Sequence, residues 1–98
     1  MNTTQFQAMV QKALEDAARR TQRDVASLEV QRAEAVTWPD GSLGCPQLGM
    51  MYTQALVPGY RIRIRAGKEI LEYHAGARGQ PVYCPRDRIT EPGPDPRV

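Results

Sequence analysis

The sequence predicts an α+β fold in which one N-terminal amphipathic helix packs on a small antiparallel sheet of about four strands. Apolar residues in the first twenty positions repeat at helical spacing. Between residues 60 and 75 they alternate with polar residues, which is the pattern of a strand with one buried face. With 98 residues, 41% of them hydrophobic, the chain is long enough for one core and too short for two domains.

The helix is predicted from about Thr4 to Thr21. Arg19 and Arg20 lie in its last turn, where cations suit the negative end of the helix dipole. Its apolar stripe follows the i, i+3, i+4 spacing and consists of Phe6, Met9, Val10, Ala13, Leu14, Ala17 and Ala18.

Two strands are predicted on either side of a loop. Residues 28–38 form the first, and a bulge near Ala33 repairs its imperfect alternation. Residues 39–49 read PDGSLGCPQLG, and their three glycines and two prolines predict a loop. Residues 50–57 are predicted as the second strand, which Pro58-Gly59 ends.

The segment from Tyr60 to Ala75 is predicted as a β-hairpin around Gly67-Lys68, with Gly at the first central position of the turn. The turn fixes the register, and both faces then pair consistently. The predicted pairs are Ile62 with Tyr73 and Ile64 with Leu71 on the core side, and Arg61 with His74 and Arg63 with Glu72 on a solvated outer side.

Residues 81–84 are predicted as a last short strand, which makes residues 1–84 the single α+β domain. Residues 85–98 are rich in proline and charge. They are predicted as a flexible tail, because they offer too little apolar surface to offset the entropy of ordering.

The composition excludes several functions. A net charge of +2 is too small to indicate a nucleic-acid or anionic membrane partner. No apolar run approaches the roughly 18 residues of a membrane span, so no membrane is expected. The first residues lack the uninterrupted apolar stretch of a signal peptide, so the expected location is the cytoplasm.

Cys45, Cys84 and His74 give three ligands where a structural zinc site needs four, so neither metal nor cofactor is expected.

The sequence contains two cysteines, Cys45 and Cys84. Either they lie close together in the fold, or they are two unpaired thiols, one of them buried; we favour proximity. A disulfide would tether the loop to the last strand and would require an oxidising compartment.

Three stretches of the chain resemble a family of small uncharacterised bacterial proteins. They are WPDGSLGCPQLGMMYTQALVPGYRI (residues 38–62), LEYH (residues 71–74) and YC (residues 83–84). The resemblance covers residues 25–84 and implies no assigned activity. Because members are often exported or lipid-anchored, it implies a Cys45–Cys84 bridge and an exported or periplasmic alternative to the cytoplasmic location.

The best candidate site is the Gly/Pro loop, because glycines let a backbone approach a ligand closely and loops on a rigid sheet often bind. We therefore expect a small non-enzymatic binding module with an unidentified protein partner. One version is inhibitor-like and presents Pro46-Gln47-Leu48 from a loop fixed by Cys45. The residues of the candidate loop site are Asp40, Gly41, Cys45, Pro46, Gln47, Leu48 and Met50.

Two alternatives remain. A small thiol-dependent enzyme or redox protein would use Cys45 as nucleophile, His74 as base and an acid such as Asp40 to orient the histidine. A basic stripe of Arg61, Arg63 and Arg65 would contact phosphates or an acidic partner. The outer-face position of the histidine argues against the enzyme, and Glu72 in the middle of the stripe argues against nucleic acid.

Overall fold

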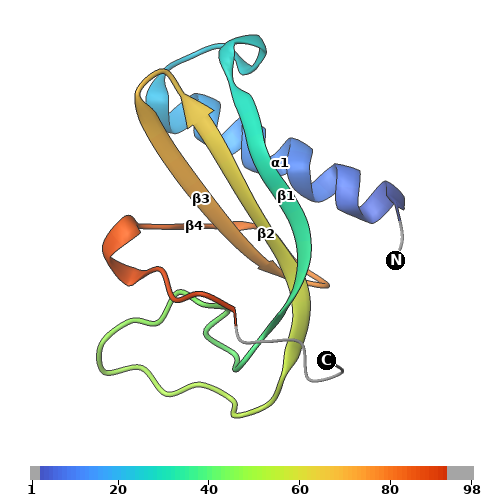
Figure 1. The fold of residues 1–98 in the computed structure, drawn as a ribbon, viewed down its shortest axis with the longest axis vertical. Helices are drawn as coiled ribbons and strands as arrows, with labels where there is room; N and C mark the ends of the chain where they lie inside the picture. The colour runs from blue at the N-terminus through green and yellow to red at the C-terminus, as the bar shows by residue number, and fades with distance from the viewer. Residues whose placement is uncertain (1–2, 93–98) are drawn as a thin grey trace.

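Over residues 3–92, which the computed structural model describes, the chain forms one α-helix, four β-strands and two short 3₁₀ turns (Figure 1). The strands make one antiparallel sheet in the order β1-β2-β3-β4, with α1 across one face. This confirms the predicted α+β architecture. The elements are α1 (Thr3–Thr21), η1 (Val25–Ser27), β1 (Glu29–Trp38), β2 (Val57–Ala66), β3 (Glu69–Gly76), β4 (Val82–Cys84) and η2 (Arg86–Arg88).

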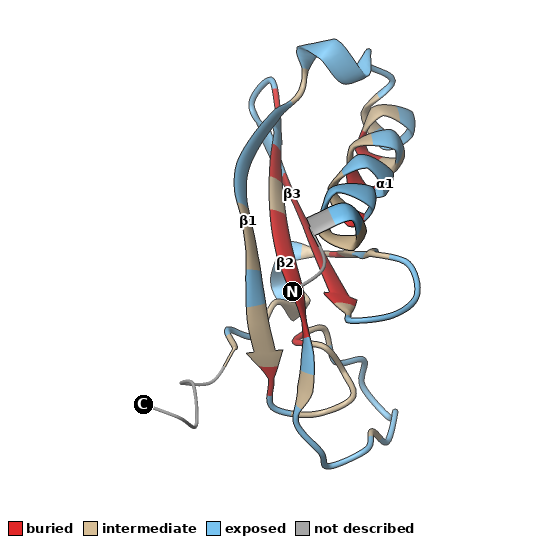
Figure 2. Cartoon of the chain, turned by 90° about the vertical axis from the view of Figure 1, so that its right-hand side faces the viewer, coloured by how far each residue is buried: buried red, intermediate tan, exposed pale blue. Residues whose placement is uncertain are grey.

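Helix α1 buries the stripe that its spacing predicts. Met9, Ala13 and Ala17 recur every fourth residue and are buried against the sheet, while the opposite side of the helix is exposed (Figure 2). The buried sheet residues of this core are Tyr60, Ile62, Ile64, Ala66, Leu71, Tyr73 and Ala75. The core therefore lies between α1 and the two central strands, β2 and β3.

The β2–β3 hairpin has the predicted register at all four pairs, including Ile62 with Tyr73 and Arg63 with Glu72. Gly67 has a φ of +63°, which is the left-handed conformation that its place in the two-residue turn requires. Because side chains alternate along a strand, the hairpin has an inner face toward α1 and a face away from it, called here the outer face.

Strand β1 matches the predicted first strand within one residue. The predicted bulge is present: the shift in the pairing of β1 with β2 lies between Val30 and Arg32, so the extra residue is Gln31, two positions before Ala33. After this bulge, Ala33 lies opposite Ile62 on the inner face.

The predicted strand at residues 50–57 is wrong. The connection between β1 and β2 runs without strand structure until Val57, and β2 continues through Pro58. Pairing of β2 with β3 begins only at Gly59, so the proline lies where β2 has β1 as its sole partner. Residues 39–56 therefore form one long loop, called here the β1–β2 loop.

The chain after β4 crosses the outer face, so part of the predicted tail belongs to the folded domain. The Thr90 N–H donates to the Gly44 carbonyl at 2.8 Å, and Glu91 pairs with Arg61. The structure describes this segment as far as residue 92; the rest of the predicted tail, residues 93–98, lies outside the described residues.

Candidate functional site

The base of the β1–β2 loop is fixed by a turn that few sequences could form. The Cys45 N–H donates to the Ser42 carbonyl at 3.0 Å, and the two residues between them, Leu43 and Gly44, have φ values of 56° and 70°. A Cβ on Gly44 would collide with the Trp38 ring, so glycine is required there for space as well as for backbone conformation.

Covalent and polar contacts hold this turn to the sheet. The Cys45–Cys84 disulfide joins the loop to β4 across a sequence separation of 39. Asp40 caps the start of the loop by accepting from the Ser42 hydroxyl at 2.6 Å and from the Ser42 N–H at 2.8 Å, and these two hydrogen bonds lower the pKa of Asp40. The predicted proximity of the two cysteines is thereby confirmed.

Residues 46–56, called here the tip of the loop, lie beyond this anchored base. The Met50 N–H donates to the Gln47 carbonyl at 3.2 Å and Gly49 has a φ of 80°, which makes residues 47–50 a type II β-turn with Leu48 at its corner. The Gln47 N–H also donates to the Tyr52 hydroxyl at 3.0 Å. Thus the turn is ordered by its own hydrogen bonds while its corner side chain projects outward.

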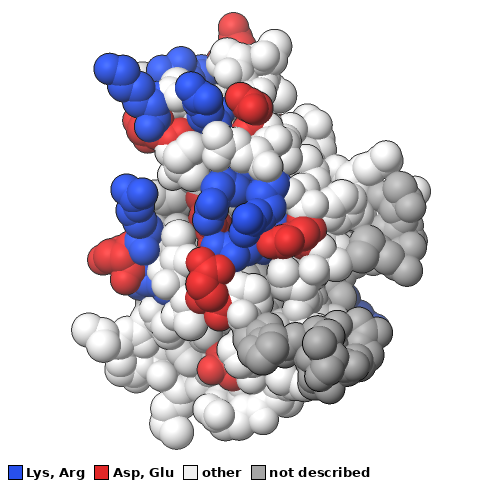
Figure 3. Space-filling view, in the orientation of Figure 1, with Lys and Arg blue, Asp and Glu red and all other residues white. Residues whose placement is uncertain are grey.

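Large apolar side chains at this tip face solvent. Leu48 and Met51 are fully exposed, at 105% and 95%, and Met50 and Leu56 are more than half exposed. No charged residue occurs in the 20 positions from Gly41 to Tyr60, although 24% of the whole chain is charged. Figure 3 shows this uneven distribution of charge. On the face in view, the charged side chains gather over the sheet, and the lower part of the molecule is almost free of them.

A groove of about 640 Å³ lies beside the tip. One wall is Pro46, Gln47 and Leu48, and the other is residues 87–90 after β4. The groove and the protruding apolar side chains therefore belong to one continuous surface.

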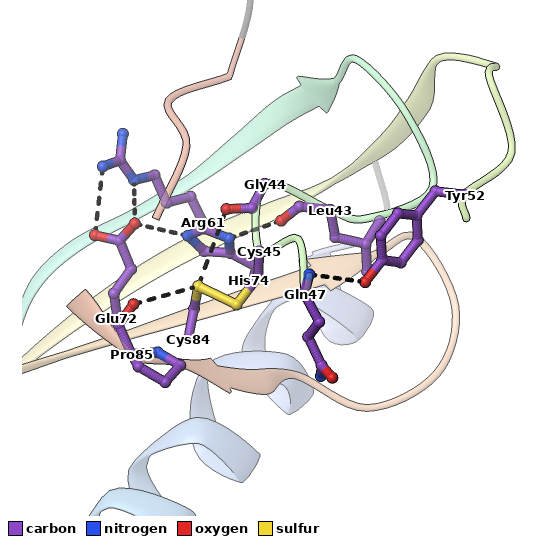
Figure 4. The surroundings of a disulfide bond; sticks show 10 residues. All are labelled: Leu43, Gly44, Cys45, Gln47, Tyr52, Arg61, Glu72, His74, Cys84 and Pro85. Atoms are coloured by element: carbon purple, nitrogen blue, oxygen red, sulfur yellow. Dashed lines mark hydrogen bonds and ion pairs between the residues drawn. A yellow bond between two sulfur atoms is a disulfide. The ribbon is translucent and has the colours of Figure 1, made fainter. Parts of the chain in front are cut away.

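Under the loop base, the outer face of the sheet carries a buried polar cluster of Arg61, Glu72 and His74, each at most 3% exposed (Figure 4). The Glu72 carboxylate accepts from Arg61 Nε at 3.0 Å and from Arg63 Nη2 at 2.8 Å. It lies 2.6 Å from His74 Nε2, and Glu91 covers Arg61 from the C-terminal segment.

Hydrogen bonding decides the charge of Glu72. Burial by itself raises the pKa of this carboxyl, but the hydrogen bonds with His74, Arg63 and Arg61 outweigh it and lower the pKa from 4.5 to about 2. Glu72 is therefore ionised at neutral pH, and its contacts are charge-assisted.

This shift predicts an acid-sensitive fold. Because the folded pKa lies below the unfolded one, the stabilisation is complete above about pH 4.5 and is lost as the pH falls through about 2. We expect a loss of about 3 kcal/mol across this window, read from urea midpoints at several pH values. The control is Glu72→Gln, whose stability should fall less steeply over the same window. Parallel curves for the two proteins would contradict the assignment.

The structure corrects the predicted outer face. Arg61 and His74 are buried rather than solvated, and Arg63 is half-buried with its guanidinium on Glu72. Of the predicted stripe, Arg65 alone is exposed, and its Nε donates to the Gly67 carbonyl at 3.1 Å. The three arginines therefore do not form a continuous solvated stripe.

The candidate loop residues divide into two groups. Asp40, Gly41 and Cys45 lie at the anchored base, whereas Pro46, Gln47, Leu48 and Met50 are exposed toward the tip. Sequence reasoning missed Met51 and Leu56, which it placed in a strand. The absence of charge between Gly41 and Tyr60 is the signal that could have found them.

The disulfide contains Cys45, which the thiol-dependent enzyme would use as its nucleophile. Both cysteines are in the disulfide, and neither sulfur is a thiolate in that state. Within residues 3–92, no group of His, Cys, Asp or Glu side chains is placed to hold a metal ion. In the same range, no helix is both long and apolar enough to span a membrane.

The described residues thus form a small helix-on-sheet domain with one long loop that a disulfide joins to the last strand. The chain belongs to the family described as Domain of unknown function (DUF8738), whose model matches residues 10–84. Comparisons with curated proteins and with solved structures gave no match. The matched range includes the sheet, the β1–β2 loop and both cysteines.

Proposed function

We propose that this protein is a non-enzymatic binding module whose contact surface is the tip of the β1–β2 loop, residues 46–56. The observation that carries the proposal is a loop tip without charged residues that exposes Leu48 and Met51 fully, while the base of the loop is fixed to the sheet. The partner is a protein with an apolar pocket that receives the corner of the 47–50 turn.

Burial of the tip would supply the binding energy. Each large apolar side chain transferred from water to an apolar pocket contributes about 1.5–3 kcal/mol. Charged residues are depleted at the centres of protein interfaces and Met is enriched there, which is the composition of this tip. Methionine also adapts its shape to a partner at low cost.

The anchored base adds to affinity by reducing the cost of ordering. A free loop of 18 residues would lose conformational entropy on binding. Here both arms of the loop are already held in place before a partner binds. The contacts that hold them are the turn at Leu43-Gly44, the disulfide and the hydrogen bond from the Gly41 N–H to the Thr53 carbonyl.

The shape of the tip favours a general binding module over the inhibitor-like version. A type II turn at residues 47–50 reverses the chain, whereas a substrate-like inhibitor must present an extended segment to a protease cleft. The groove between residues 46–48 and 87–90 is the second part of the surface, and its lining combines apolar side chains with the charged Asp87 and Arg88.

A single charge at the corner tests the proposal. Leu48→Arg is expected to reduce retention of the partner in a pull-down about tenfold or more, because a buried unpaired charge is costly in an apolar pocket. Its melting temperature should stay close to that of the wild type, since the side chain makes no buried contact.

The matched control is Ile70→Arg, which places the same charge on a half-exposed apolar position of β3 next to the hairpin turn, at the far end of the sheet from the loop. A protein retained by the wild type and by this control, but not by Leu48→Arg, supports the proposal. Equal retention by all three chains rejects it.

A further inference from the structure

His74 is the single histidine of the sequence, and both of its ring nitrogens face oxygen atoms. Nδ1 lies 2.7 Å from the Leu43 carbonyl oxygen, and Nε2 lies 2.6 Å from Oε2 of Glu72. The first oxygen belongs to the base of the β1–β2 loop and the second to the buried cluster on β3. The ring therefore bridges the loop and the sheet, as Figure 4 shows.

Counting donors fixes the protons on this ring. A backbone carbonyl can only accept, and an ionised carboxylate can only accept. Glu72 is kept ionised by Arg61 and Arg63, so it has no proton to give to His74. A neutral imidazole has one N–H and could satisfy one of the two oxygens, whereas an imidazolium satisfies both.

The aromatic neighbour favours the same form. The Trp38 ring lies 4.4 Å from the His74 ring, centroid to centroid, at an angle of 31°, and a cation is attracted to the face of an indole. The Trp38 Nε1–H donates to the Ala75 carbonyl at 3.0 Å, so the indole is itself fixed to β3.

We propose that His74 is the positioning residue of the β1–β2 loop, and that it acts as a doubly protonated ring which donates simultaneously to the Leu43 carbonyl and to Glu72. The loop base is thereby held by a proton as well as by the disulfide. This deepens the proposed function, since it names what regulates the binding loop, but its first test involves no partner.

Charged groups on three segments surround the ring. From β3 the ring faces Glu72, which is paired with Arg61 and Arg63 of β2; Glu91 of the C-terminal segment pairs with Arg61. The bond to the carboxylate is charge-assisted, and the bond to the Leu43 carbonyl is the weaker of the two.

Loss of the His74 bridge should loosen only the loop base, because the inner-face core between α1 and the hairpin does not include His74.

The single histidine makes the test direct. In ¹⁵N NMR of the wild-type chain at neutral pH, we expect both ring nitrogens to carry a directly bonded proton. The amides of Cys45 and Thr90 close the loop base. A ring nitrogen without a directly bonded proton would overturn the proposal.

A substitution distinguishes positioning of the loop by the hydrogen bonds of His74 from a purely steric role of this side chain. His74→Gln keeps one donor and places an acceptor at the other end of the side chain. We expect about tenfold faster hydrogen exchange at the Cys45 and Thr90 amides, with unchanged protection at Ile62 and Ile64. Unchanged exchange at the loop base would reject the positioning role. If this variant does not fold, the ¹⁵N spectrum of the wild-type ring still decides, and neither readout depends on a binding partner.

Discussion

Replacement of Glu72 by Gln is expected to destabilise the fold by about 3–5 kcal/mol, which is the usual cost of removing one partner from a buried ion pair. The carboxylate accepts from Arg61, Arg63 and His74, and it is 3% exposed. Gln has nearly the same shape, so packing is retained. Its amide NH₂ would face donors, however, and the buried Arg61 guanidinium would keep its charge without the carboxylate on β3.

Urea unfolding at neutral pH measures the effect, and a lower midpoint with an unchanged slope is expected. Glu69→Gln is the matched control, because it removes the same charge from the same strand at an exposed position. This control should change stability by no more than about 0.5 kcal/mol. A Glu72→Gln chain as stable as the Glu69→Gln chain would show that the cluster does not stabilise the fold.

The elements that sequence predicted best are those fixed by local rules. The hairpin register followed from a two-residue turn and a period of two between residues 60 and 75, and every predicted pair is present. The helix followed from the spacing of Met9, Ala13 and Ala17. In both cases the residues that decide the structure are neighbours along the chain.

The buried cluster could not be predicted in this way. Arg61 and Arg65 occupy equivalent positions in the same alternating pattern, yet Arg61 is buried and Arg65 is exposed. What distinguishes them is cover from segments distant in sequence, since Glu91 lies over Arg61 and the Leu43 carbonyl binds His74 beside it. Strand periodicity contains no information about such cover.

The error at residues 50–57 has a different origin. A short apolar run predicts burial, and burial beside a turn predicts a strand. Here Met51 and Leu56 are apolar and exposed, so the run reflects a surface and not a core. The anchored loop keeps these apolar residues exposed to solvent. The same exposure explains why the strand prediction failed here and why we propose a binding surface at this loop.

Removal of the disulfide is the second large effect that we expect. Cys45 and Cys84 are separated by 39 positions, and the entropy of closing a loop of that length in the unfolded chain corresponds to about 4 kcal/mol. A Cys45→Ala/Cys84→Ala double variant should lose this amount in urea unfolding. Alanine is preferable to serine, because Cys84 is 1% exposed and a hydroxyl there would add a buried polar group.

The wild-type chain in a dithiol reductant provides the control, since the sequence has no other cysteine that could form a different bridge. The reduced wild type and the double variant should agree in midpoint, and both should keep the inner-face core intact at low urea. Equal stability of the oxidised and reduced wild type would contradict the prediction.

The same pair of proteins distinguishes the two kinds of interaction that hold the loop base, which are the disulfide and the hydrogen bonds. Without the disulfide, the Leu43–His74 and Gly44–Thr90 hydrogen bonds still hold the base. The Cys45-position amide of the double variant should therefore stay partly protected from hydrogen exchange, because these two hydrogen bonds remain. If this amide exchanges freely, the disulfide alone orders the loop base; if it stays protected and loses that protection when His74→Gln is added, His74 is an independent anchor of the loop base.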